Sequence, residues 1–133
     1  MSKFASKILN HKKWLDTHGN DGVRLEVFDG EFEDLELTGI DLFSVAFPGT
    51  LFKNCIIRRT NLNKSNLASV IFENCDLSET TFRKSNLDYA SFFNCKLRHT
   101  SFFKSTLYEA KFVNTNLDSV DFLNAYTLGM TAT

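Results

Sequence analysis

The sequence predicts an all-β solenoid with a square cross-section, on the basis of three observations. A large apolar residue returns at every fifth position, a small residue stands two places before it, and whole groups of residues recur every twenty positions. A helix presents one face at intervals of three and four residues, and a half-buried strand at intervals of two, so a five-residue period belongs to neither. The period instead indicates a coil made of short, repeated sides.

The five-residue series defines one side of the coil. Its large residues run from Val27 to Phe122 without a change of register, which gives twenty in succession. From residue 50 onward the residue two places earlier is small, as at Thr50, Cys55 and Ala90. The first three residues of a unit then point inward, outward and inward, as in a strand. The last two both face solvent, so the chain must turn a corner there.

The number of sides follows from the twenty-residue recurrence. Four columns of identical residues show it: Asn54, Asn74, Asn94 and Asn114; Cys55, Cys75 and Cys95; Lys64, Lys84 and Lys104; and Phe32, Phe52, Phe72, Phe92 and Phe112. Twenty residues hold four units, so four sides make one coil and like residues stack on like. Coils of fifteen residues would place these columns out of register. About five coils at a strand spacing of about 4.8 Å give a rod of about 24 Å.

Length and composition limit the classes of protein to consider. The 133 residues suffice for one domain, and 15 Lys and Arg residues nearly balance 16 Asp and Glu residues. Direct nucleic-acid binding through overall charge is therefore not expected. No apolar run approaches the ~18 residues of a membrane helix, and the first residues lack the pattern of a secretory signal. Three cysteines, an odd number, favour the cytoplasm over a disulfide framework.

The chain resembles the pentapeptide repeat family. The family consensus reads Ala, then Asp or Asn, then Leu and two variable residues; the units that follow it here include Ser65-Asn66-Leu67, Ser85-Asn86-Leu87 and Thr115-Asn116-Leu117. The resemblance covers roughly residues 25–126 and implies a right-handed quadrilateral β-helix. The chain departs from the consensus at the small position, where Cys, Thr or Ser is more frequent than Ala.

Three segments are expected: a capping helix and turn over residues 1–20, the β-helix over 21–126, and a C-terminal tail over 127–133. Phe4, Ile8, Leu9 and Leu15 lie at near-helical spacing, with Ser2 as the N-cap and the glycines of "HGNDG" ending the helix. Such a helix would cover the sheet edge that a solenoid leaves open at its end.

No catalytic, metal or cofactor site is predicted. Cys55, Cys75 and Cys95 form a straight inward column of three thiols, whereas zinc requires four ligands in a tetrahedron. Small buried cysteines are therefore preferred over the alternative of a metal site. The histidines are not placed beside an inward nucleophile and an orienting acid, as a catalytic triad would require; they are His11, His18 and His99. An enzyme is not expected.

Two sets of outward residues are candidates for binding a partner. One is basic, with an ordinary solvated surface as the alternative: Arg58, Arg59, Lys64, Arg83, Lys84, Arg98 and Lys104. The other is apolar and lies on the side of the Phe column, with scattered surface residues as the alternative: Leu51, Ile71, Phe93 and Val113.

The C-terminal end is a candidate for self-association. After Phe122 only Tyr126, Leu128 and Met130 remain to cover the last coil. An uncovered edge offers unpaired backbone groups to another chain, and a twofold contact closes an assembly. A homodimer joined end to end is expected; the alternative is a monomer whose tail folds over the edge.

The function that these features favour is a non-catalytic scaffold for protein interactions, with an unknown partner. The family resemblance supplies an alternative, a mimic of DNA that binds type II topoisomerase (gyrase) and protects it from quinolones. Those members are strongly acidic along the rod. Here eight acids lie between Asp21 and Asp41, and from Thr50 onward ten basic residues face seven acidic ones. The charge distribution therefore favours the scaffold.

Overall fold

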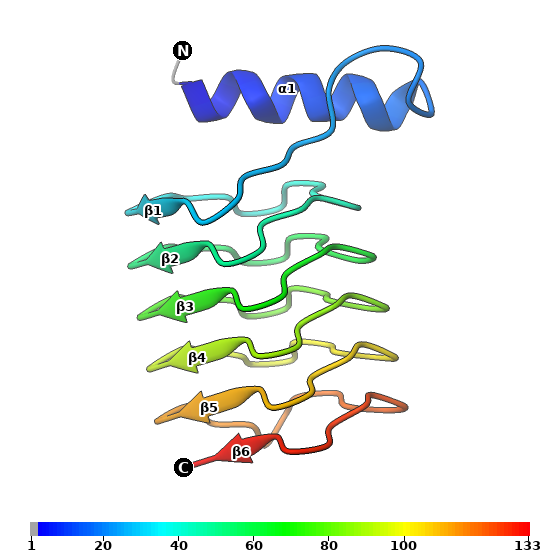
Figure 1. The fold of residues 1–133 in the computed structure, drawn as a ribbon. Coiled ribbons are helices and arrows are strands. Elements are labelled where there is room, and N and C mark those ends of the chain that lie inside the picture. Colours follow the sequence, from blue (N-terminus) through cyan, green and yellow to red (C-terminus); the bar gives the residue numbers. More distant parts are fainter. Residues whose placement is uncertain (1–2) are drawn as a thin grey trace.

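The computed structural model describes residues 3–133, which form one helix followed by a stack of coils (Figure 1). The elements in chain order are α1 (Lys3–Asp16), β1 (Glu31–Glu33), β2 (Leu51–Lys53), β3 (Ile71–Glu73), β4 (Ser91–Phe93), β5 (Lys111–Val113) and β6 (Thr131–Ala132). The strands form one parallel sheet in sequence order. The predicted β-solenoid of about five coils with an N-terminal helix is confirmed.

The register between coils is twenty residues throughout. On the side that carries the strands, which we call the first side, Phe52 pairs with Phe32 and with Phe72. Isolated parallel bridges hold the other sides at the same interval, such as Ile56 with Asp76, Asn61 with Thr81 and Asn66 with Asn86. We call these the second, third and fourth sides, in chain order.

The corners are turns in which the last residue of a unit has a positive φ, with Ser119 as an exception. Asn54, Asn74 and Asn94 adopt φ of 53–54° between the first and second sides. Asn tolerates this left-handed conformation better than other residues with a Cβ. The corner between the third and fourth sides instead uses Lys64, Lys84 and Lys104, with φ of 53–58°.

Columns of stacked side chains fill the interior. Phe72 is 1% exposed, and its ring centroid lies 5.2 Å from that of Phe52 and 5.3 Å from that of Phe92. Rings of the third side meet this column edge-on, as Phe82 does at 6.0 Å from Phe72. Buried leucines form the columns between them, for example Leu67, Leu77 and Leu87. The inward and outward assignment of the repeat is therefore confirmed.

The small inward residues connect successive coils. The hydroxyl of Thr100 donates to the carbonyl of Leu77 at 2.7 Å, and that of Ser85 donates to the carbonyl of Leu62 at 2.7 Å. The thiol of Cys95 makes the equivalent contact with the carbonyl of Phe72 at 3.3 Å. Because these buried polar atoms have hydrogen-bond partners, they connect one coil to the next and the bonds offset the cost of desolvation.

The helix α1 lies across the N-terminal end of the stack, as Figure 1 shows. The buried side chain of His11 holds it there: Nδ1 accepts the backbone N–H of Leu25 at 3.0 Å, and Nε2 donates to the carbonyl of Phe43 at 2.8 Å. This pattern fixes the neutral tautomer. Sequence reasoning tested His11 only as a catalytic group and missed this role.

The helix ends in a Schellman motif in which His18 and the predicted Gly19 both have a positive φ, with His18 in the position that glycine usually occupies. The N–H of Gly19 bonds to the carbonyl of Trp14 at 2.8 Å, and His18 has φ of 52°. The second glycine, Gly22, has φ of 75°, and a Cβ there would collide with the backbone of Asn10. The predicted N-cap, Ser2, lies outside the described residues.

The last residues continue the solenoid. Residues 127–133, which the sequence separates as a tail, include β6, and the N–H of Thr133 donates to the carbonyl of Phe112 at 2.9 Å. Ala132 occupies the place of a large inward residue, opposite Phe112. Backbone pairing therefore extends two sides further than the apolar series, along the fourth side through Tyr126 and the first side through β6.

Candidate interaction surfaces

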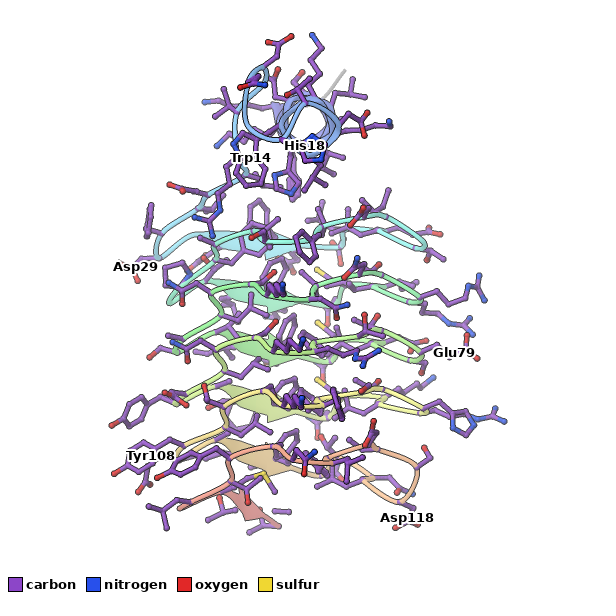
Figure 2. All side chains as sticks on the ribbon, turned by 90° about the vertical axis from the view of Figure 1, so that its right-hand side faces the viewer. Trp14, His18, Asp29, Glu79, Tyr108 and Asp118 are labelled. Atoms are coloured by element: carbon purple, nitrogen blue, oxygen red, sulfur yellow. The ribbon has the colours of Figure 1, made fainter. Side chains whose placement is uncertain are left out.

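The basic residues predicted to form one surface separate into two groups. At the corner between the second and third sides, Arg58 lies 3.7 Å from a carboxylate oxygen of Asp76, and Arg59 lies 3.9 Å from one of Glu79. Arg98 lies near this group, because it and Arg58 line the same shallow depression of about 560 Å³. Figure 2 shows Glu79 and Asp118 projecting along this edge of the rod. Acids thus compensate much of the basic charge here.

The second group forms a surface that we call the lysine corner, between the third and fourth sides. Its residues are Phe43, Lys64, Arg83, Lys84, Phe103 and Lys104. All four of its cationic side chains are exposed, and within residues 3–133 none of them makes an ion pair with an acid. The corner therefore presents positive charge that the rest of the rod does not neutralise.

Aromatic rings support the cations of the lysine corner. The Lys64 ammonium lies 5.9 Å from the ring centroid of Phe43. The guanidinium of Arg83 and the ammonium of Lys104 lie 4.7 Å and 5.3 Å from the ring centroid of Phe103. Such cation–π contacts stabilise by about 0.5–1 kcal/mol each at exposed sites. Both rings are only partly exposed, and the side chains of Lys64, Arg83 and Lys104 lie against them along the corner.

The lysine corner is costly for the fold. Each of Lys64, Lys84 and Lys104 adopts a left-handed conformation that costs a residue with a Cβ about 1–2 kcal/mol. Like charges on successive coils also repel, by about 1 kcal/mol at 4 Å in water. Asn at the equivalent positions of another corner carries no charge and tolerates this conformation better. Other corners share the left-handed strain, as at Arg59 and Glu79, so the repulsion between stacked like charges is the cost that is particular to the lysine corner.

Acidic residues lie at both ends of the third side, which adjoins the lysine corner. The outward column of that side, held in register by parallel bridges, reads Asp41, Asn61, Thr81, Ser101 and Asp121. Its three middle members are neutral. The positive region is therefore limited to the three coils that carry the lysines, a length of about 10 Å between the first and the last.

The apolar set predicted on the first side is only partly exposed. Leu51 pairs with Ile71, and Phe93 pairs with Val113, but the two pairs occupy different positions in their strands. Ile71 is opposite Ser91, and Phe93 is opposite Glu73. All four side chains are half-buried. The set is therefore two neighbouring pairs and not one continuous column.

A more exposed apolar cluster lies toward the C-terminal end, and sequence reasoning found only part of it. The ring of Tyr108 lies 5.5 Å from that of Tyr89 and 6.4 Å from that of Tyr126. Tyr89 is 57% exposed and Leu128 is 62% exposed. The negative charges that Tyr89 and Glu109 can carry raise the pKa of Tyr108, which projects from the edge of the rod in Figure 2. The recurrence of Tyr near the fourth-side corner was the available signal.

The predicted dimer end contains residues of two kinds. Tyr126 and Leu128 are exposed, whereas Met130 is half-buried against the core. Phe122 and Val120 of the last coil are also only partly buried, in contrast to their equivalents in earlier coils. The C-terminal end therefore leaves core side chains incompletely covered.

The three stacked cysteines have the burial expected of small side chains that fill the interior. Cys55, Cys75 and Cys95 are unpaired and 1–6% exposed. A hydrogen bond that the Cys55 thiol donates to Cys75, together with burial, raises the pKa of the Cys55 thiol, which favours its neutral form. Among residues 3–133 no group of three or more His, Cys, Asp or Glu side chains could hold a metal ion. Nor is any helix of that part of the chain long and apolar enough to cross a membrane.

Comparison with solved structures shows the same architecture in other proteins. A pentapeptide repeat protein from the thylakoid lumen of Arabidopsis thaliana is similar with a TM-score of 0.67 and 17% identity, over 71% of this chain and 66% of that one. The chain thus spans about two thirds of that protein. Rfr23, from the cyanobacterium Cyanothece 51142, has a TM-score of 0.51 and 17% identity, over 95% of both chains. At these identities the similarity shows the fold alone.

QnrB1, a plasmid-mediated fluoroquinolone resistance protein, is also similar, with a TM-score of 0.35 and 13% identity over 84% of this chain and 92% of that one. No curated protein gives a significant sequence match. Two family descriptions do match: "Pentapeptide repeat region" over residues 65–130 and "Pentapeptide repeats (8 copies)" over residues 36–74. The chain therefore belongs to the pentapeptide repeat family.

Proposed function

We propose that this protein is a non-catalytic scaffold that binds another protein through outward columns of its solenoid. The observation that carries the proposal is the separation of the two sets of side chains. Inward residues fill the interior, whereas outward residues form straight columns with a fixed spacing. A rigid surface of this kind needs little ordering when it binds, which favours affinity.

The charges of the outward columns support a scaffold for a partner other than gyrase over the DNA-mimic alternative. A DNA mimic must be acidic along its length. Here the coils that follow the acidic first coil carry the uncompensated lysine corner. We further propose that the scaffold works in a reducing compartment such as the cytoplasm, which its three unpaired cysteines favour. The exposed side chains of Tyr126 and Leu128 support our proposal of an end-to-end homodimer.

Affinity purification with a panel of outward variants tests the scaffold. Each variant replaces one outward column by glutamine or serine and leaves the interior unchanged, and thermal unfolding confirms that each is folded. We expect a protein that the wild type retains in stoichiometric amount and that at least one variant releases. A partner that every variant still retains, or the absence of any partner retained by the wild type, contradicts the scaffold. A gyrase supercoiling assay decides the alternative, because a DNA mimic changes supercoiling and the scaffold proposed here leaves it unchanged.

A further inference from the structure

We propose that the lysine corner binds an acidic segment of a protein partner in extended conformation, with carboxylates at alternate positions. This inference rests on the proposed scaffold function and names the surface and the chemistry that it recognises. Its starting point is four exposed cations that make no ion pair within residues 3–133, in a chain whose overall charge is −1. A carboxylate partner would supply the missing counter-charge.

The spacing of the lysine corner fits an extended segment. Successive lysines are one coil apart, about 4.8 Å, so Lys64 and Lys104 are about 10 Å apart at the backbone. Alternate residues of an extended chain are about 6.7 Å apart on one face, so two carboxylates fit within this length. Arg83 lies beside the middle lysine and can bind one carboxylate with two parallel hydrogen bonds.

The aromatic rings of the lysine corner make the site partly ordered before binding. Phe103 lies beneath both Arg83 and Lys104, and Phe43 lies near Lys64. Each contact restricts a long side chain before the partner binds, so less conformational entropy is lost on binding. The exposed parts of the rings also offer apolar contact to the uncharged residues between the carboxylates.

The surroundings of the lysine corner favour a short acidic segment over a long polyanion. Asp41 and Asp121 lie at the two ends of the adjoining column. A nucleic acid that continues past the corner would meet these acids, and proteins that depend on phosphate contacts typically make more of them, about 6–10. A short peptide ends before the acids and avoids this repulsion.

A peptide titration tests the proposal on the full chain. The probe is a fluorescent peptide with Glu at alternate positions and Ser between them, and its control carries Gln in place of Glu. The test variant is Lys64→Gln/Lys84→Gln/Lys104→Gln. The matched control, Lys53→Gln/Lys96→Gln/Lys111→Gln, makes the same change in net charge on other sides of the rod. Unfolding curves confirm that both variants are folded.

We expect the Glu peptide to bind the wild type and the control variant with dissociation constants within about twofold of each other. The test variant should bind at least about tenfold more weakly, and added salt should weaken the wild type. The Gln peptide should not bind. Phe103→Leu should also weaken binding, because Arg83 and Lys104 lose their ring.

Four results would overturn the proposal. One is no binding of the Glu peptide, and another is equal weakening in both triple variants, which would show that bulk charge alone is sensed. A third is tighter, lysine-dependent binding of oligothymidylate or of phosphatidylserine vesicles. The fourth is self-association that only the test variant loses, which would assign the corner to the acidic first coil of a second copy. If the protein retains a partner in affinity purification but does not bind the Glu peptide, the proposed scaffold function still holds and only the proposed role of the lysine corner is wrong.

Discussion

Replacement of Phe72 by alanine should destabilise the protein by about 3–5 kcal/mol. The side chain is 1% exposed and is stacked between Phe52 and Phe92, with Phe82 edge-on. Its removal therefore loses the burial of a whole ring and also three ring pairs, which contribute about 0.5–1.5 kcal/mol each as part of that total. The neighbouring coils are hydrogen-bonded through their backbones, so they cannot close the cavity.

Thermal unfolding followed by circular dichroism measures this effect. The entropy of unfolding of a chain of this size is about 0.28 kcal/mol/K, so the loss corresponds to a fall of about 11–18 °C in Tm. The matched control is Glu73→Ala, one residue further along the chain and pointing outward, which should change stability by no more than about 0.5 kcal/mol. Equal losses in the two variants would refute the inward and outward assignment of the repeat.

Three further predictions concern other parts of the rod. Burial lowers the pKa of His11 below 6.5, so as pH falls from about 7 toward the lowered value the unfolded chain takes up the proton first. Urea unfolding should therefore show that the free energy of unfolding falls over this pH range in the wild type and falls less in His11→Gln. An equal dependence of stability on pH in the two proteins would contradict the buried, neutral state of His11. Leu128→Asp should convert a dimer to a monomer in sedimentation, and a wild type that is already monomeric would contradict the end-to-end contact. Alanine at all three cysteines should leave a folded protein with no lost metal, and stoichiometric zinc in the wild type would contradict this.

The sequence predicted the interior of this protein more completely than its surface. Inward positions obey a strict five-residue rule because each must fill a fixed volume, so residues such as Leu67 and Phe72 could be assigned from spacing alone. The twenty-residue columns gave the register for the same reason. The N-terminal helix was predicted from its apolar spacing. The hydrogen bonds by which His11 holds the helix to the coils were not, because the partners of His11 are backbone groups 14 and 32 residues away.

Outward side chains could be placed on corners but not paired. The repeat placed Arg58 on the second side and Lys64 on or beside the third, but it did not give their contacts. In the structure Arg58 reaches Asp76, whereas Lys64 reaches Phe43. These contacts join adjacent columns of successive coils and depend on the rotamers of long side chains, which no sequence period records. The β6 strand was missed because its inward residue, Ala132, is small, although the backbone pairing there is unchanged.

The central claim is that the interior of the rod provides stability and its outward columns provide binding. The most direct test is to measure unfolding and binding of the Glu peptide on one variant, Lys64→Asn/Lys84→Asn/Lys104→Asn. Relief of left-handed strain and of charge repulsion, less the lost cation–π contacts, should leave the free energy of unfolding unchanged or raise it by up to about 2 kcal/mol. Binding of the peptide should be abolished. A variant that loses more than about 1 kcal/mol of stability, or that still binds the peptide as the wild type does, would contradict the account.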